Sequence, residues 1–282
     1  MRAKTYLFLT TTLTLIVLLA ACSSGPSAPE KGTPAFSWNA AKETYAAADY
    51  NKTLEHLGNL LKTDNEFKAQ AMPWLMTLES GLIHGYMELA DTYETGARAN
   101  KTNPGAFRRL TSNYRTFAKR LSLEYASNVQ TFQKTAGTEV PLSFPFPNGN
   151  RALPPTMSRI ASGIMPPESE VEANQNQVLH RNVMLQTALA SGCGDDTTKA
   201  QSLFKTADLK VPRAEFMTAA AESLHDQALL YGPTKLDEPE KMKMLLAEAR
   251  DSLKNVPENK AVKELTGKLD KAEKATAKKG KA

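Results

Sequence analysis

The chain has 282 residues, 41% of them hydrophobic, and a formal net charge of +5 at pH 7. That length is enough for one large domain or two small ones around a hydrophobic core. From Lys271 onward five lysines stand against a single glutamate, so the basic excess belongs to the C-terminal end. The composition therefore does not indicate a nucleic-acid-binding protein.

The N-terminal end has the pattern of an export signal. Arg2 and Lys4 precede an apolar run over residues 6–19, and small residues follow it. A run of about 14 residues is too short to span a bilayer comfortably and fits the central part of a signal peptide. No later segment of the sequence is apolar enough to cross a membrane.

Residues 19–22 read Leu-Ala-Ala-Cys, which resembles the lipobox of bacterial lipoproteins. The resemblance implies that residues 1–21 are a signal peptide and that Cys22 becomes the acylated N-terminal residue, held in a lipid bilayer. By the sorting pattern of that class, Ser23 favours the outer membrane, with the protein facing the periplasm. An ordinary signal peptide with an incidental cysteine is the alternative.

Residues 22–36 are rich in Ser, Gly, Pro and Ala, and we expect a flexible tether there, ahead of a helical domain over residues 37–277. The one other cysteine, Cys193, would have no partner for an intramolecular disulfide once Cys22 is acylated. Its surroundings, Ser-Gly-Cys-Gly-Asp-Asp, predict a helix end and a turn. We expect Cys193 to be a turn residue without a chemical role, with a reactive thiol or an intermolecular disulfide as the alternative.

From Ser37 the apolar residues recur every three or four positions, which is the period of a helix buried on one face. Ser37 is expected to cap the first helix, and Pro73 to open the third, which runs to about Ala97. The predicted apolar stripes of the first three helices are Trp38, Ala41, Tyr45 and Ala48; Leu54, Leu57, Leu60 and Leu61; and Trp74, Leu78, Leu82, Tyr86, Leu89 and Tyr93.

Gly81 and Gly85 lie four residues apart on the face beside the third stripe. Glycine weakens a helix, so a pair in register suggests the close approach of another element. A closely packed helix is the favoured interpretation, and a ligand is the alternative.

Asn103-Pro104 predicts the start of the longest helix, which runs to about Thr135. Arg108, Arg115 and Lys119 share one of its faces. We interpret this basic stripe as a solvated face, and a surface that grips an anionic ligand or partner is the alternative. The predicted buried side is Phe107, Leu110, Tyr114, Phe117, Leu121, Tyr125 and Phe132.

Residues 137–167 interrupt the helical pattern and contain seven of the sixteen prolines. Because they also carry Val140, Leu142, Phe144 and Phe146, we expect an ordered loop that packs over the helices or lines a cleft. A strap that joins two helical halves is favoured over a functional loop. Residues 140–146 are the one candidate for a short extended segment.

Five more helices are predicted after this loop. Three glutamates suit the first turn of a helix over residues 168–192, and Asp237 with Glu240 predicts a capping box. Residues 278–282 are predicted as a basic disordered tail. The remaining predicted helices cover residues 197–206, 212–230, the segment from the capping box to Pro257, and 259–277.

The predicted fold class is all-α, built of antiparallel helical hairpins. Trp38, Ala41 and Tyr45, followed by leucines in the next helix, resemble the tetratricopeptide motif, as does the segment 216–257. That resemblance implies degenerate repeats, without a regular 34-residue period, whose concave surface grips a protein partner of the cell envelope.

A lipidated chain of helical hairpins is also similar to the periplasmic T component of TRAP-type transporters, on the strength of the layout and the long helix at residues 104–135. This second resemblance implies transport and a small or apolar ligand. In that case the loop residues Phe144 and Phe146, with Trp74 and Tyr86, would wall a pocket.

Catalytic and metal-binding motifs are missing from the sequence. Four scattered histidines form no pair at the spacing of helical metal ligands, and the side chains of His225 and Asp226 are expected to diverge. No nucleophile elbow, phosphate loop or dinucleotide fingerprint is present. We therefore expect no enzyme and no cofactor, which leaves two hypotheses: a protein-interaction scaffold and a carrier of a small or apolar molecule.

Overall fold

The computed structural model describes residues 29–149, 151–206 and 208–279, so the predicted signal peptide, the lipobox and Cys22 lie outside the described residues. Within these ranges the fold is all-α, as predicted, and no helix is long and apolar enough to cross a membrane. The elements are α2 (Pro34–Ala46), α3 (Tyr50–Leu61), α4 (Lys68–Ala99), α5 (Gly105–Gln133), β1 (Glu139–Pro141), α6 (Pro155–Ala161), α7 (Glu168–Ala190), α8 (Thr197–Leu203), β2 (Lys210–Pro212), α9 (Arg213–Ala228), the 3-10 turn η1 (Leu229–Tyr231), α10 (Pro239–Leu253) and α11 (Lys260–Lys279).

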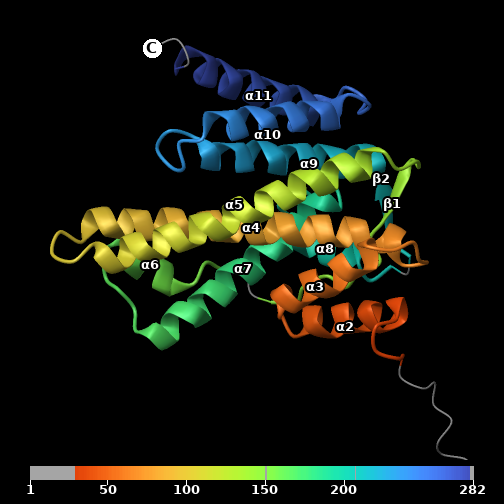
Figure 1. Cartoon of the computed structure of the whole chain (residues 1–282), viewed down its shortest axis with the longest axis horizontal. Helices are drawn as coiled ribbons and strands as arrows, with labels where there is room; N and C mark the ends of the chain where they lie inside the picture. The colour runs from red at the N-terminus through yellow and green to blue at the C-terminus, as the bar shows by residue number, and fades with distance from the viewer. Residues whose placement is uncertain (1–28, 150, 207, 280–282) are drawn as a thin grey trace, which may run out of the picture.

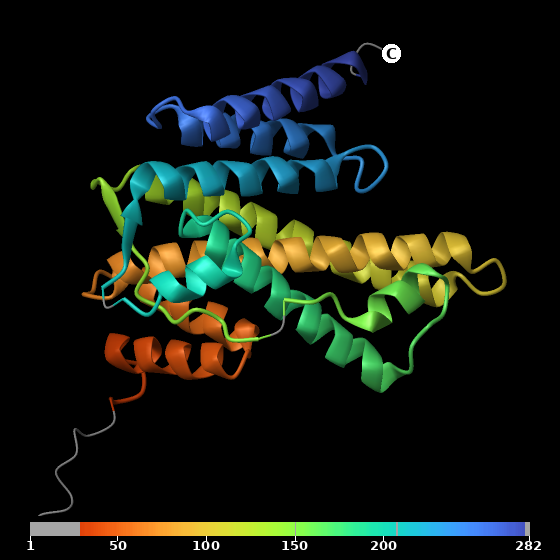
Figure 2. The ribbon, with the colours of Figure 1, turned by 180° about the vertical axis from the view of Figure 1, so that it is seen from behind.

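The helices are stacked in layers around the long α4–α5 hairpin (Figure 1). The α2–α3 hairpin packs on one side of α4, and α9, α10 and α11 follow one another on the other side. Seen from behind, α7 crosses α4 obliquely (Figure 2) and contacts it along much of its length. One cluster of buried apolar residues extends from Trp38 to Ala272, so most of the layers share a core.

The pair of glycines in α4 lets α7 approach closely. A Cβ atom on Gly81 would lie 2.6 Å from the Cα of Val183, and one on Gly85 would lie 3.1 Å from the Cα of Leu179. The first separation is too short for a real side chain, and the second is tighter than most real Cβ contacts. The structure therefore has the close helix packing that was favoured for this pair.

Two predicted helix caps are wrong. Ser37 lies buried inside α2, and the hydroxyl of Thr33 caps the helix by accepting the Phe36 N–H at 3.2 Å. Asp237 has a positive φ of 52°, and the cap position of α10 belongs to Glu238, which makes no side-chain cap bond. In both places the helix starts one to four residues away from the expected cap. For α2 the start follows a local signal, because Thr33 supplies the N-cap and Pro34 is the first helical residue.

Pro73 does not open a helix but lies inside α4, which starts at Lys68. A proline there forfeits one backbone hydrogen bond. Trp74, Leu75 and Met76 directly after it are all buried, so packing in the core compensates for the lost bond.

The C-terminal helix α11 extends through Lys279, so Lys278 and Lys279, the first residues of the predicted tail, have helical backbone. The rest of that tail lies outside the described part of the chain.

The described residues of the loop at 137–167 pack onto the helices, as predicted. Val140, Leu142, Phe144 and Phe146 are all buried. Its first residues form β1, which pairs antiparallel with β2 and places Val140 opposite Val211. The sequence predicted neither β2 nor the short helix α6, because segments of three and seven residues give little periodic signal.

Candidate functional site

An aromatic layer lies where the loop meets α2 and α4. The rings of Trp74 and Phe144 are stacked, with centroids 5.5 Å apart and planes 8° apart. Tyr45 and Trp38 meet the Trp74 indole edge-on, at 5.2 and 5.4 Å. Because all four rings are buried against one another, they fill the core instead of walling a cavity.

The other two residues predicted for an apolar pocket are also packed against rings. Tyr86 stacks on Phe117 at 5.3 Å. Phe146 meets Phe204 at 5.6 Å in a second small cluster, and the same Phe204 ring meets Phe144 at 5.5 Å. Of the four predicted aromatic residues, Phe144 borders a hollow of about 450 Å³, which is also lined by polar side chains.

Phe117 itself, predicted to be buried, is 44% exposed. It lies at the margin of the buried face of α5 and covers Tyr86 with one side of its ring.

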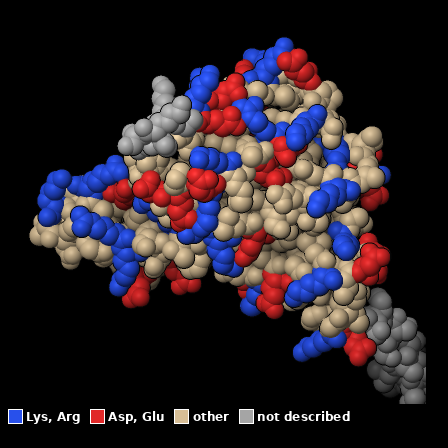
Figure 3. Space-filling model, turned by 45° about the horizontal axis from the view of Figure 1, so that its top comes forward, with Lys and Arg blue, Asp and Glu red and all other residues tan. Residues whose placement is uncertain are grey.

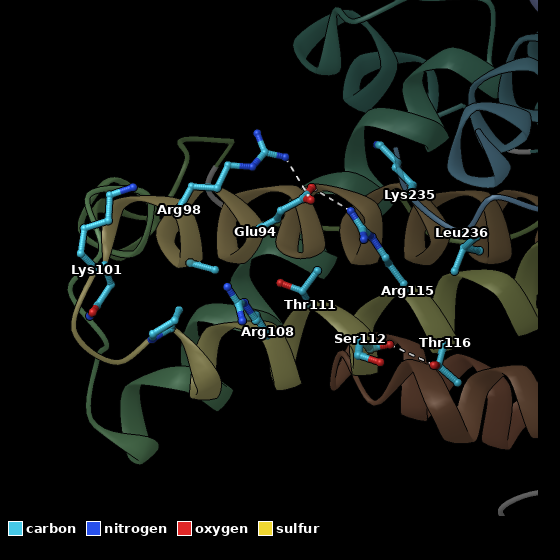
Figure 4. Close-up of a pocket in the computed structure, with 13 residues that line it drawn as sticks. Glu94, Arg98, Lys101, Arg108, Thr111, Ser112, Arg115, Thr116, Lys235 and Leu236 are labelled. Carbon is cyan, nitrogen blue, oxygen red and sulfur yellow. Dashed lines mark hydrogen bonds and ion pairs between the residues drawn. The ribbon is translucent and has the colours of Figure 1, made fainter. Parts of the chain in front are cut away.

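The basic stripe of α5 leads to an open groove of about 710 Å³. One wall is the end of the α4–α5 hairpin, and the other is the connection between α9 and α10 (Figure 4). Arg108 and Arg115 line it, whereas Lys119 does not; the Lys119 Nζ pairs with Glu238 at 2.5 Å. We call this feature the basic groove; its lining is Glu94, Ala97, Arg98, Asn100, Lys101, Pro104, Arg108, Thr111, Ser112, Arg115, Thr116, Lys235 and Leu236.

A carboxylate bridge organises one wall of the basic groove. Glu94 accepts a hydrogen bond from Arg115 at 2.7 Å and pairs with Arg98 at 3.0 Å (Figure 4). The Arg115 side chain is only 13% exposed, and its Nε–H is buried without an acceptor among the described residues. On the opposite wall, Lys235 pairs with Asp91 at 2.8 Å. These contacts hold three cationic side chains in place, those of Arg98, Arg115 and Lys235.

Two further cations of the groove have no carboxylate partner in the described part of the chain. Lys101 lies in the turn between α4 and α5, and Arg108 lies in the first turn of α5. Both are exposed. Figure 3 shows Lys and Arg side chains gathered at the end of the molecule where this turn lies. The sequence pointed to Arg108 and Arg115 but not to Lys235 and Leu236, which tertiary packing brings across from another part of the chain.

A histidine–aspartate cluster lies where α4 packs against the end of α9. Contrary to expectation, the side chains of His225 and Asp226 do not diverge: the ring Nδ1 lies 2.9 Å from the Asp226 Oδ1. His84 of α4 approaches the other carboxylate oxygen at 3.5 Å, so the carboxylate lies between two rings. Burial raises the Asp226 pKa, but hydrogen bonds with His225 and His84 outweigh burial and hold the pKa well below its ordinary value.

This cluster lacks the geometry of a nucleophile–base pair. The other contact of His84, from its Nδ1, is with the Ser80 carbonyl oxygen at 2.8 Å. Across the described ranges, no group of His, Cys, Asp and Glu could hold a metal ion. The cluster joins α4 to α9 and has no hydroxyl poised for attack.

One buried carboxyl group is exceptional. Glu79 of α4 is 3% exposed, and the amide of Asn128 donates to both of its oxygens at 2.9 Å. Burial raises the pKa of Glu79 from 4.5 to about 8, against the opposing effect of the Asn128 hydrogen bond. The carboxyl group is therefore mostly neutral at pH 7.

Cys193 lies in a turn, as predicted, between two glycines with positive φ. Its thiol is buried, 3.9 Å from the carbonyl oxygen of Ser191.

Comparisons with protein-family models, with curated proteins and with solved structures find no match for this chain.

Proposed function

We propose that this chain is a lipid-anchored helical scaffold of the bacterial cell envelope that holds a protein partner at its basic groove. One observation carries the proposal. The basic groove, which is built from separate elements, is wide, open and charged, whereas aromatic residues that would wall an apolar pocket pack against one another.

A carrier of a small or apolar molecule needs a concave site that buries most of the ligand against apolar side chains. The lining of the basic groove comprises five cations, Glu94, three hydroxyls and one amide, with Ala97, Pro104 and Leu236 as its apolar residues. The hollow beside Phe144 is lined by Lys42 and Asp208 among others. Such linings suit a polar protein surface better than an apolar ligand.

The anchor in this proposal rests on residues 19–22 and their resemblance to the lipobox, with acylation at Cys22 and the outer membrane as the expected site. The groove lies at the opposite end of the molecule from α2, the first described helix (Figure 1). A chain tethered ahead of α2 would therefore present its groove away from the attachment point.

Crosslinking of the full chain in its native envelope, followed by affinity capture and mass spectrometry of proteins, lipids and metabolites, tests the proposal. We expect a recurrent protein partner in stoichiometric amount. Recovery of a stoichiometric apolar molecule without any protein would overturn the scaffold and favour the transport-associated alternative.

The anchor is tested with Cys22→Ala, which should remove the protein from membrane fractions or block its processing. Cys193→Ala is the matched control and should leave fractionation unchanged. Membrane association of the Cys22→Ala protein equal to that of the parent would refute the anchor.

A further inference from the structure

We propose that the basic groove binds an acidic peptide segment of the partner protein, an inference that rests on the proposed scaffold function. The segment's Asp or Glu side chains would pair with Arg108 and Lys101, and its backbone would lie along the hydroxyl-bearing face of α5.

The first argument is charge. Five cationic side chains line the groove, whereas Glu94 is the one carboxylate of the lining and Asp91 pairs with Lys235 from outside it. Glu94 is shared by Arg98 and Arg115. The groove thus keeps an excess of positive charge inside a concave surface, where the field of several cations adds and attracts an anionic segment.

The second argument is that some polar groups of the groove have no partner among the described residues. Arg108 and Lys101 have no carboxylate within reach among the described residues, so neither must break an existing ion pair to bind a partner. The guanidinium of Arg108 can bind a carboxylate through two parallel hydrogen bonds. The buried Nε–H of Arg115 lacks an acceptor among the described residues, which is costly, and marks a donor that a rearranged complex could satisfy.

The third argument is the class of partner. A groove of about 710 Å³ is much larger than a single phosphate group needs, and it combines cations with Thr111, Ser112 and Thr116 hydroxyls and with Leu236. A peptide can use all three kinds of contact: carboxylates, backbone amides and apolar side chains. A membrane surface would contact a protruding face and not the floor of a groove, and the groove lies away from the α2 end.

The test measures binding of a fluorescent peptide of alternating Glu and Leu to the purified full chain in neutral detergent, by fluorescence anisotropy. A peptide with Lys in place of Glu is the probe control. We expect binding of the acidic peptide alone, weakened when salt rises from about 0.1 M to about 1 M, because the Debye length falls from about 10 to about 3 Å.

The decisive comparison uses two adjacent arginines of α5. Arg108→Glu, in the groove, should lower the affinity for the acidic peptide by about tenfold or more. Arg109→Glu makes the same change of charge one residue away, at an exposed side chain outside the groove lining. Its affinity for the acidic peptide should stay within about twofold of that of the parent. Since neither side chain has an ion-pair partner among the described residues, both variants should unfold at the temperature of the parent.

Three results would overturn the inference: no binding of the acidic peptide, equal loss in the two variants, or displacement of the peptide by inorganic phosphate or anionic phospholipid at equal concentration. The crosslinking experiment separates this failure from failure of the scaffold. A captured protein partner that survives Arg108→Glu would leave the scaffold standing and remove the groove from its interface.

Discussion

Trp74 and Phe144 stack nearly parallel, with ring centroids 5.5 Å apart, and this contact joins the proline-rich loop to α4. Both rings are buried, and Trp74 is fully enclosed. The contact makes the loop part of the core, so loss of this contact should lower the stability of the whole domain.

Phe144→Ala should therefore lower the free energy of unfolding by about 3 kcal/mol or more, because it removes buried apolar surface and leaves a cavity. Phe117→Ala is the matched control: that ring is 44% exposed, and its loss should cost about 1 kcal/mol or less. Urea unfolding followed by tryptophan fluorescence measures both. Equal losses in the two variants would show that the loop is not part of the core.

Substitution of Gly81 by alanine should destabilise the domain, since the added Cβ would meet the Val183 backbone at 2.6 Å. The loss should be about 1–3 kcal/mol, the range for overpacking a closed interface. Gly58→Ala in α3 has open space around the added atom and should instead gain about 0.5–1 kcal/mol from helix propensity. Thermal unfolding of both variants would reveal these opposite signs, and a stable Gly81→Ala would argue against close packing of α4 on α7.

The raised pKa of Glu79 predicts a pH dependence of stability. The folded chain holds this proton up to a pKa of about 8, whereas the unfolded chain releases it near 4.5. Stability should therefore fall as pH rises between these values, by about 1.4 kcal/mol per pH unit from this group alone.

Glu79→Gln imitates the neutral carboxyl group and should flatten that slope. The variant should gain stability relative to the parent as pH approaches 8, with little difference near pH 4. Urea unfolding across this range measures the change. Parallel curves for parent and variant would mean that Glu79 does not keep its proton.

Arg250 of α10 connects the outermost helix to the stack. Its Nε donates to Glu273 of α11 at 2.7 Å, and its Nη2 also bonds Asp270. Arg250→Gln should weaken the docking of α11 by about 1 kcal/mol, because half-exposed charge-assisted bonds are worth about that much.

Hydrogen exchange of the α11 amides measures this loss. Lys254→Gln is the control. It removes the ion pair between Lys254, the residue directly after α10, and Asp251 of α10, and the Lys254 side chain is 68% exposed. Faster exchange in α11 for both variants alike would contradict a specific role of Arg250.

The helices and their buried faces follow from local periodicity. Tyr114, Leu121 and Tyr125 are buried on α5 as predicted, because residues three and four apart share a helix face. The prediction that Pro73 opens a helix was wrong. Proline prefers the first turn of a helix, but packing around Trp74 outweighs that local preference. Short elements such as β2 were missed, since their pairing depends on a distant segment.

The groove could be predicted only in part. Arg108 and Arg115 share a helix face, so their proximity is visible in the sequence. The opposite wall, at Lys235 and Leu236, comes from packing of the C-terminal layers against the hairpin, which no local pattern encodes. The favoured interpretation of the stripe as a solvated face fits Arg108, which is exposed, but not Arg115, which is held by Glu94.

The length of α4 sets the distance between the aromatic layer and the basic groove. Its 32 residues span about 48 Å at 1.5 Å per residue, from the aromatic layer near one end to Glu94 and Arg98 near the other. The close contact with α7 at Gly81 and Gly85 stiffens the middle of this span. The helix therefore fixes the separation between the groove and the α2–α3 end of the protein, and a partner bound in the groove would be held at that separation.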